Sequence, residues 1–168
     1  MSFVAIILAA AKKAGVSGSL LLAICTHESG LKNVLVPSDG GSPSYGICQI
    51  KYETAKMVGF QGEAEDLMGP KTNAKWAAAY LKFQKSRYDG DWMKSTAAYN
   101  SGTYNESKKV PGCPRNLKYI KHVQKKLDEK LQERLECAIV RTEGSYENWK
   151  NRNRLDKIST KNKVARLP

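Results

Sequence analysis

The sequence predicts a mainly helical fold with one small β element. Apolar residues recur at three- and four-residue steps in several segments, and typical capping residues flank these segments. Only the stretch 45–50 is short and alternating, as expected for an extended segment. The chain has 168 residues and is 41% hydrophobic, which is enough for one domain with its own core. We therefore expect a single domain with a short appendage at one end.

Two apolar helices are expected at the start of the chain. The first spans Ser2–Ala14, because its large apolar residues recur at core-facing helical spacing. A cleavable signal or a membrane anchor is the alternative, but no basic segment precedes this stretch and two lysines follow it directly. The second helix carries Leu20–Ser29, with Ser17 as its N-cap and Gly30 as its stop. We expect no clear signal peptide and no transmembrane segment.

The middle of the chain is expected to hold the loops and the β element. Turn-forming residues over 37–43 predict a loop. Residues 45–50 are expected to form a small strand or the rim of a cleft. A short helix over 54–59 and a loop over 62–66 follow.

The second half is expected to be helical again. Pro70 begins a longer helix, as proline is favoured in the first turn, and another helix covers 92–99. One long helix is predicted over 117–140, from apolar residues four apart. A polar, basic tail follows it. We assign residues 1–124 to the main domain and residues 125–168 to a C-terminal helix extension and basic tail.

The cysteines at positions 25, 48, 113 and 137 form no CxxC pair and no zinc-like spacing with the two histidines. Cys25 lies in an apolar helix, where a cysteine behaves as a small buried thiol. The default expectation is a reduced chain without a metal or other cofactor. A Cys25–Cys48 bridge is the alternative.

The charge balance indicates an anionic partner. The formal net charge is +12, and residues 148–168 alone carry seven basic residues against one acidic residue. Nucleic acid, anionic lipid and anionic wall polymers all fit such a balance. No helix-turn-helix or zinc signature supports a specific nucleic-acid partner.

Glu28 is the candidate for chemistry. It follows Leu21 and Ile24 on one helical face, so a core face ends in a carboxylate. Partial burial and the negative end of the helix dipole both favour the protonated form, which a general acid needs. The plainer interpretation is a glutamate at the edge of the core with its head in water.

Four short motifs follow one another along the chain. They are Glu28-Ser29, Ser44-Tyr45-Gly46-Ile47-Cys48-Gln49, Ala98-Tyr99-Asn100-Ser101-Gly102 and Tyr119-Ile120. In this order they resemble the family 1 lytic transglycosylases, whose SLT domain has a lysozyme-like fold, over about Phe3 to Val123. Further landmarks match at Thr54-Ala55, Pro70, Asn73 and Tyr80-Leu81. Ile47-Cys48 stands where the family usually has Leu-Met.

The resemblance implies a peptidoglycan-cleaving enzyme without a cofactor. It implies that Glu28 protonates the glycosidic oxygen between N-acetylmuramic acid and N-acetylglucosamine, then takes a proton from the sugar's own 6-hydroxyl, which leaves a 1,6-anhydro end. Supporting or substrate-binding roles are implied for Ser29, Ser44, Gly46, Gln49, Tyr99, Asn100 and Tyr119. By the same resemblance, Gly46 allows the backbone to approach the sugar and the Tyr119 hydroxyl orients the catalytic carboxyl.

Two other functions stay open. A goose-type lysozyme shares the fold but hydrolyses the bond, and Asp39 could then hold the attacking water, although its Asp-Gly-Gly context also fits a plain turn. A non-catalytic wall- or nucleic-acid-binding module would use the basic surface alone. The expected setting is the bacterial periplasm or cell wall, as a stand-alone enzyme that could be phage-encoded or virion-associated. The C-terminal extension could dock a virion or envelope-machine partner.

Overall fold

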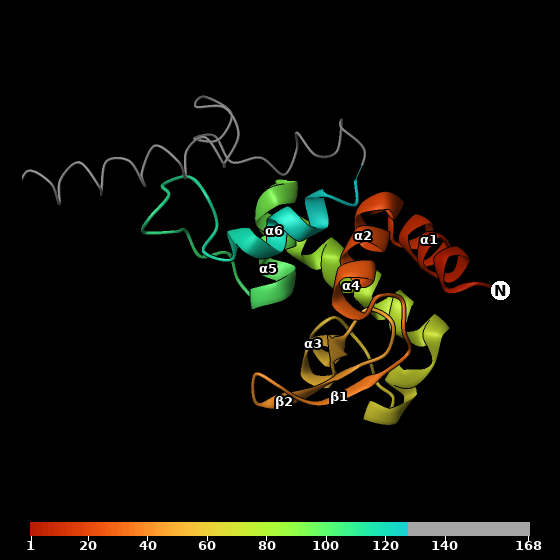
Figure 1. Cartoon of the computed structure of the whole chain (residues 1–168). Coiled ribbons are helices and arrows are strands. Elements are labelled where there is room, and N and C mark those ends of the chain that lie inside the picture. The colour runs from red at the N-terminus through yellow and green to blue at the C-terminus, as the bar shows by residue number, and fades with distance from the viewer. Residues whose placement is uncertain (128–168) are drawn as a thin grey trace, which may run out of the picture.

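The computed structural model describes residues 1–127, and residues 128–168 lie outside the described part of the chain. Helices form the body, and a small antiparallel sheet in the order β1-β2-β3 covers one end of it with α3 (Figure 1). This confirms the predicted fold class, mainly helical with a small β element. The elements are α1 (Phe3–Ala14), α2 (Gly18–Ser29), β1 (Leu35–Asp39), β2 (Ser42–Tyr45), β3 (Ile50–Lys51), α3 (Tyr52–Met57), the 3₁₀ helix η1 (Ala64–Met68), α4 (Pro70–Arg87), α5 (Trp92–Ser101) and α6 (Leu117–Gln124).

The first two helices begin and end where their capping residues predict. The Ser2 and Ser17 hydroxyls accept backbone N–H bonds at the starts of α1 and α2. Gly15 and Gly30 end these helices in the left-handed conformation that glycine adopts without penalty. α1 packs on α2 and α4 and contributes Ile7 to the core, as expected for a core helix. None of the described helices is both long and apolar enough to cross a bilayer.

The sheet differs from the predictions for 37–43 and 45–50. The turn-rich stretch forms most of a hairpin, in which Gly40 and Gly41 make the turn with positive φ. Pro37 is tolerated because it lies in β1, an exposed strand at the edge of the sheet. Residues 46–49 form a tight turn between β2 and β3 instead of a strand. The alternative prediction for this stretch, the rim of a cleft, fits better, because Gln49 and Ile50 line a cavity.

The long helix predicted over 117–140 ends early within the described residues. α6 stops at Gln124, and the backbone N–H of Lys125 bonds back to the carbonyls of Lys121 and Val123. The chain then turns, and this turn buries Leu127. The four-residue apolar spacing therefore marked buried positions correctly but not an unbroken helix. The rest of that prediction lies outside the described residues.

Candidate active site

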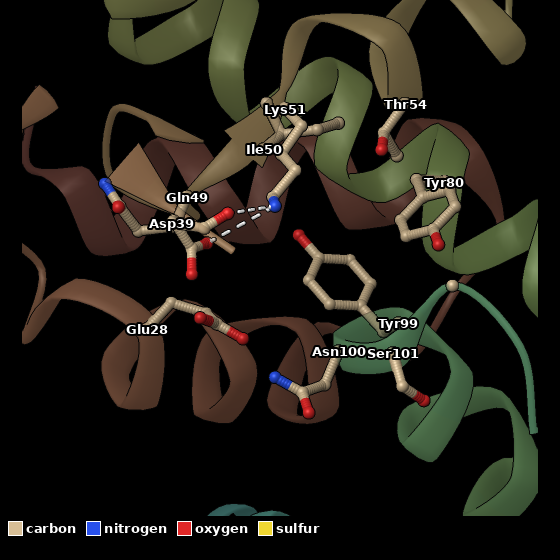
Figure 2. Close-up of a pocket in the computed structure, with 11 residues that line it drawn as sticks. Glu28, Asp39, Gln49, Ile50, Lys51, Thr54, Tyr80, Tyr99, Asn100 and Ser101 are labelled. Carbon is tan, nitrogen blue, oxygen red and sulfur yellow. Dashed lines mark hydrogen bonds and ion pairs between the residues drawn. The ribbon is translucent and has the colours of Figure 1, made fainter. Parts of the chain in front are cut away.

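A cavity of about 310 Å³ opens between the end of α2, the sheet and α5 (Figure 2). Six residues from the sequence motifs line it, together with Asp39 from the end of β1. The lining residues are Glu28, Asp39, Gln49, Ile50, Lys51, Thr54, Tyr80, Tyr99, Asn100, Ser101 and Gly102. Four stretches of the chain thus meet around one space: the end of α2, the sheet with the start of α3, Tyr80 of α4 and the end of α5.

Glu28 lies in the last turn of α2 and is half-buried. The Tyr119 hydroxyl of α6 donates a hydrogen bond of 2.9 Å to Glu28 Oε1. The pKa of Glu28 is raised to about 7, first because burial disfavours the carboxylate and also because Asp39 adds negative charge nearby. The Tyr119 bond opposes this rise in pKa, since it stabilises the carboxylate. Glu28 can therefore carry or release a proton near neutral pH.

Two buried tyrosines surround the carboxyl group. Tyr99 of α5 lines the cavity, and its hydroxyl donates to the Cys48 carbonyl at 3.3 Å. Burial and the nearby Glu28 charge raise the pKa of Tyr99 and of Tyr119 well above the usual value, so both remain neutral hydrogen-bond donors. The Tyr80 ring lies 5.2 Å from the Tyr99 ring between centroids and packs that side of the cavity.

Asp39 is the second carboxylate of the cavity. Figure 2 shows the side chains of Asp39 and Glu28 directed toward the same space. One Asp39 oxygen accepts the Ser44 hydroxyl at 2.7 Å and lies 4.0 Å from the Lys51 ammonium group. Lys51 also donates to the Asp39 backbone carbonyl. These contacts hold Asp39 in place.

The turn over 46–49 is held by Asn73, a fully buried residue of α4. Its Oδ1 accepts the Cys48 N–H at 2.8 Å, and its Nδ2 donates to the carbonyls of Tyr45 and Leu67. Gly46 has a φ of 73°, and a Cβ there would lie 2.4 Å from Asn73 Nδ2. Glycine is therefore needed at position 46 because the backbone there lies close to the Asn73 side chain. Gly46 does not line the cavity, which departs from the expected approach to a sugar.

Ser29 and Gln49 connect the same turn to its neighbours. The Ser29 hydroxyl at the end of α2 donates to the Ile47 carbonyl at 2.7 Å. Gln49 Nε2 donates to the carbonyls of Val34 and Gly46 at 2.9 and 2.7 Å. Because these two bonds occupy both amide hydrogens, only the Gln49 side-chain oxygen remains to contact a ligand.

A disulfide joins α2 to the turn, and the expectation of reduced thiols is therefore wrong. Cys25 and Cys48 are bonded across a separation of 23 residues, with their Cα atoms 4.1 Å apart. Both are fully buried. The spacing of the two cysteines along the chain gave no sign of a bridge. They meet because the turn over 46–49 packs against α2 at Cys25, three residues before Glu28. Cys113 is also disulfide-bonded.

Asn100 is the last of the predicted site residues on α5. It is exposed, and its Oδ1 accepts a hydrogen bond of 3.0 Å from Asn116 Nδ2. Asn116 also donates to the Ala97 carbonyl, so Asn100 is anchored to the helix that carries it. Its own side-chain amide group is left to face the cavity (Figure 2).

The predicted residues therefore fall into two layers. Glu28, Gln49, Tyr99 and Asn100 line the cavity. A second layer lies behind them and consists of Ser29, Ser44, Gly46 and Tyr119. Ser44 is fully buried and contacts Asp39, so it is placed to position that residue rather than to touch a ligand.

Sequence reasoning missed three kinds of contributor. Lys51 lines the cavity but belongs to no motif, and Thr54 lines it although it was noted only as a landmark. Asn73 was noted only as a landmark, although a polar residue between the apolar positions of a helix is a signal for a buried hydrogen-bonding role. The Cys25–Cys48 bridge had been the less favoured alternative.

Two solved structures show the fold of this chain. An inactive mutant of the lytic transglycosylase Slt from Pseudomonas aeruginosa is 20% identical, with a TM-score of 0.53, over 79% of this chain and 22% of that one. The 70-kDa soluble lytic transglycosylase in complex with bulgecin A is 18% identical, with a TM-score of 0.50, over 77% of this chain and 20% of that one. The chain thus spans about a fifth of the length of either protein.

The family follows from a more direct comparison. A family model described as the transglycosylase SLT domain matches residues 5–121. The chain therefore belongs to the transglycosylase SLT domain family, and its fold is the lysozyme-like fold of that domain. This confirms the resemblance that the four motifs indicated.

Proposed function

We propose that this protein is a peptidoglycan lytic transglycosylase. It cleaves the β-1,4 bond between N-acetylmuramic acid and N-acetylglucosamine and leaves 1,6-anhydro-muramyl ends. The observation that carries the proposal is Glu28: a carboxyl group with a pKa of about 7, held by Tyr119, in a cavity that the family's motifs line. Membership of the SLT domain family supports the same activity.

Glu28 acts twice in the proposed reaction. Its carboxyl proton moves to the glycosidic oxygen as the bond from that oxygen to the muramyl C1 breaks. The N-acetyl carbonyl oxygen of the substrate bonds to C1 and takes the place of a second protein carboxylate. The Glu28 carboxylate then removes the proton of the muramyl 6-hydroxyl, whose oxygen displaces the N-acetyl oxygen at C1. The cycle ends with Glu28 protonated again, and no water is consumed.

The surrounding residues position Glu28 and the sugar in the proposed reaction. Tyr119 orients the carboxyl group of Glu28, and its neutral hydroxyl stabilises the carboxylate that forms after proton transfer. Asn100 offers its amide group to the sugar, and Gln49 offers its side-chain oxygen. Ser29 and Gly46 hold the turn behind them.

Hydrolysis by a goose-type lysozyme mechanism is the second candidate, because Asp39 lines the same cavity as Glu28. In that mechanism Asp39 would hold the attacking water. The contacts of Asp39 with Ser44 and Lys51 favour a structural role instead. Asp39→Asn separates the two: a transglycosylase retains cleavage of purified peptidoglycan at a reduced rate, whereas loss of all activity supports hydrolysis.

Glu28→Gln tests whether the chain is an enzyme at all. The substituted amide keeps the size of the side chain and still accepts the Tyr119 bond, but it cannot donate and recover a proton at neutral pH. The variant should lose release of soluble muropeptides from purified sacculi and keep binding to them. If Glu28→Gln releases muropeptides as fast as the parent chain, Glu28 is not the acid. If neither protein releases any, a non-catalytic wall-binding module is favoured.

The proposed setting is the peptidoglycan layer, in the bacterial periplasm or cell wall. Peptidoglycan carries anionic stem peptides, and a net charge of +12 favours approach to them. The C-terminal extension over 125–168 and its virion or envelope-machine partner remain a prediction, because nearly all of that segment lies outside the described residues.

A further inference from the structure

All charged residues of α1 and α4 are basic. α1 carries Lys12 and Lys13 in its last turn. α4 has eighteen residues without a single aspartate or glutamate. Its charged residues are Lys71, Lys75, Lys82, Lys85 and Arg87. Among residues 1–127, no ion pair involves any of these side chains, so within the described part of the chain two neighbouring helices present positive charge without a paired carboxylate.

A groove of about 550 Å³ runs between these two helices. Its floor is apolar and mostly made of alanines, which leave room where larger side chains would fill the space. Four exposed lysines form its rim. The floor consists of Ile6, Ala9, Ala10, Ala14 and Ala79, and the rim of Lys13, Lys71, Lys75 and Lys82; Met1 also lines the groove.

The outer face of α1 continues this apolar surface. Val4 and Leu8 are 38% and 41% exposed, although a soluble helix usually shows polar residues there. Ala5 and Ala9 are exposed beside them. From Phe3 to Ala10 the helix has no polar side chain. The apolar surface is therefore a helix face plus a groove, with lysines along its border.

This surface is separate from the candidate active site. The groove and the Glu28 cavity have no lining residue in common. In Figure 1, α1 lies at one edge of the helical body and α5, which lines the cavity, lies on the other side of α2 and α4. A partner on α1 and α4 would leave the cavity open.

We propose that the face formed by α1 and α4 binds the anionic surface of a lipid bilayer. An apolar helix face bordered by lysines is the pattern of helices that lie in the headgroup region. α1 has twelve residues and is about 18 Å long, which is too short for a hydrocarbon core of about 30 Å, so it lies along the surface. The rim lysines meet lipid phosphates.

Two other occupants fit this surface less well. An acidic amphipathic helix of another protein would fill the groove but leave Val4 and Leu8 uncovered on the outer face of α1. A second copy of this chain would bring two sets of unneutralised lysines together. A bilayer covers the helix face and the groove at once and supplies the opposite charge.

Flotation of the full chain with lipid vesicles tests this proposal. We expect binding to phosphatidylcholine vesicles that contain about 30% phosphatidylglycerol and little binding to pure phosphatidylcholine. The double variant Val4→Gln, Ala9→Gln makes the apolar face of α1 more polar without changing its charge. Lys71→Glu with Lys75→Glu reverses two rim charges. Each pair should weaken binding by about tenfold or more, since both apolar contact and charge contribute.

The matched control is Lys108→Glu with Lys109→Glu, which changes the net charge equally at two exposed positions of the loop before α6. It should weaken binding by less than about threefold. Circular dichroism and peptidoglycan cleavage should be unchanged in all variants, since none of them alters the cavity. Equal loss from both lysine pairs would show attraction to net charge alone and overturn the proposal. Failure to bind anionic vesicles, or concentration-dependent dimers instead, would do the same.

Discussion

Glu28 lies where three influences on its pKa meet. Burial raises the pKa most, the Asp39 charge raises it further, and the hydrogen bond from Tyr119 lowers it, with a result of about 7. Because the proposed first step needs the protonated acid, its rate should fall as the pH rises through about 7. In the proposed reaction, the pKa of this single residue sets the alkaline limit of activity.

Tyr119→Phe should move that alkaline limit to higher pH. The substitution removes the only one of the three influences that lowers the Glu28 pKa, so the carboxyl group keeps its proton longer. Activity at the optimum should fall roughly 10- to 100-fold, because the carboxyl group loses its orientation. The measurement is the pH profile of kcat/KM for both proteins. A limit that stays in place or moves to lower pH would show that Tyr119 does not act on the Glu28 carboxyl.

At the scale of elements, the turn over 46–49 connects three parts of the site. The Cys25–Cys48 disulfide and Ser29 attach it to α2, which carries Glu28. Asn73 attaches it to α4, and Tyr99 attaches it to α5. This turn therefore helps to set the position of the proposed catalytic carboxylate relative to the sheet.

Replacing both Cys25 and Cys48 with alanine should lower the free energy of unfolding by about 2–4 kcal/mol, since the bridge restricts the unfolded chain. Activity should fall as well, because α2 and the turn lose their covalent link. Each single variant should lose about as much stability as the double variant if the bridge is responsible. Urea denaturation of the three variants measures this. Separate, additive losses would assign the effect to packing of the two side chains instead.

Asn73→Asp should destabilise the turn by about 2–3 kcal/mol, because two buried carbonyls lose their donor and a charge is buried. Asn33→Asp is the matched control. Asn33 is exposed and makes a single side-chain bond, to the Met68 carbonyl, so its loss should stay near 1 kcal/mol or below. Chemical denaturation compares the two. Equal losses would mean that Asn73 does not hold the turn.

Sequence patterns predicted the structural features that depend on residues close together in the sequence. The caps Ser17 and Gly30, the Pro70 helix start and the core face of α1 all rest on local geometry, and the structure has them. The hairpin at 35–45 was missed because Pro37 and Gly40 suggest a loop unless the edge position of β1 is known. The disulfide and the Asp39–Ser44 contact depend on long-range packing, for which spacing carries no signal.

At the scale of the whole molecule, the apolar, basic face of α1 and α4 and the Glu28 cavity lie on different sides. The SLT domain match covers residues 5–121, so α1 through the start of α6 form the family's domain. Within it, the cavity lies beside α5 and the sheet, and the apolar, basic face lies on α1 and α4. With the proposed activity, this separation would leave the cavity open to glycan strands while the face formed by α1 and α4 contacts an anionic surface.

Added salt should therefore weaken substrate binding rather than slow the chemical step. Raising the salt concentration from about 0.05 to about 0.3 M shortens the range of electrostatic attraction to the wall, so KM for purified sacculi should rise severalfold. The value of kcat should change by less than about twofold, because Glu28 is shielded by burial. Initial rates of turbidity loss at several sacculus concentrations measure both. A fall in kcat at constant KM would contradict this account.

The central claim is that Glu28 works without a water molecule. Digestion of purified peptidoglycan in water enriched with ¹⁸O, followed by mass spectrometry of the muropeptides, tests this most directly. We expect anhydro-muramyl ends, one water lighter than reducing ends and free of the label from the start of the digest. Reducing muramyl ends that carry ¹⁸O from cleavage itself would contradict it and make the protein a hydrolase on the same fold.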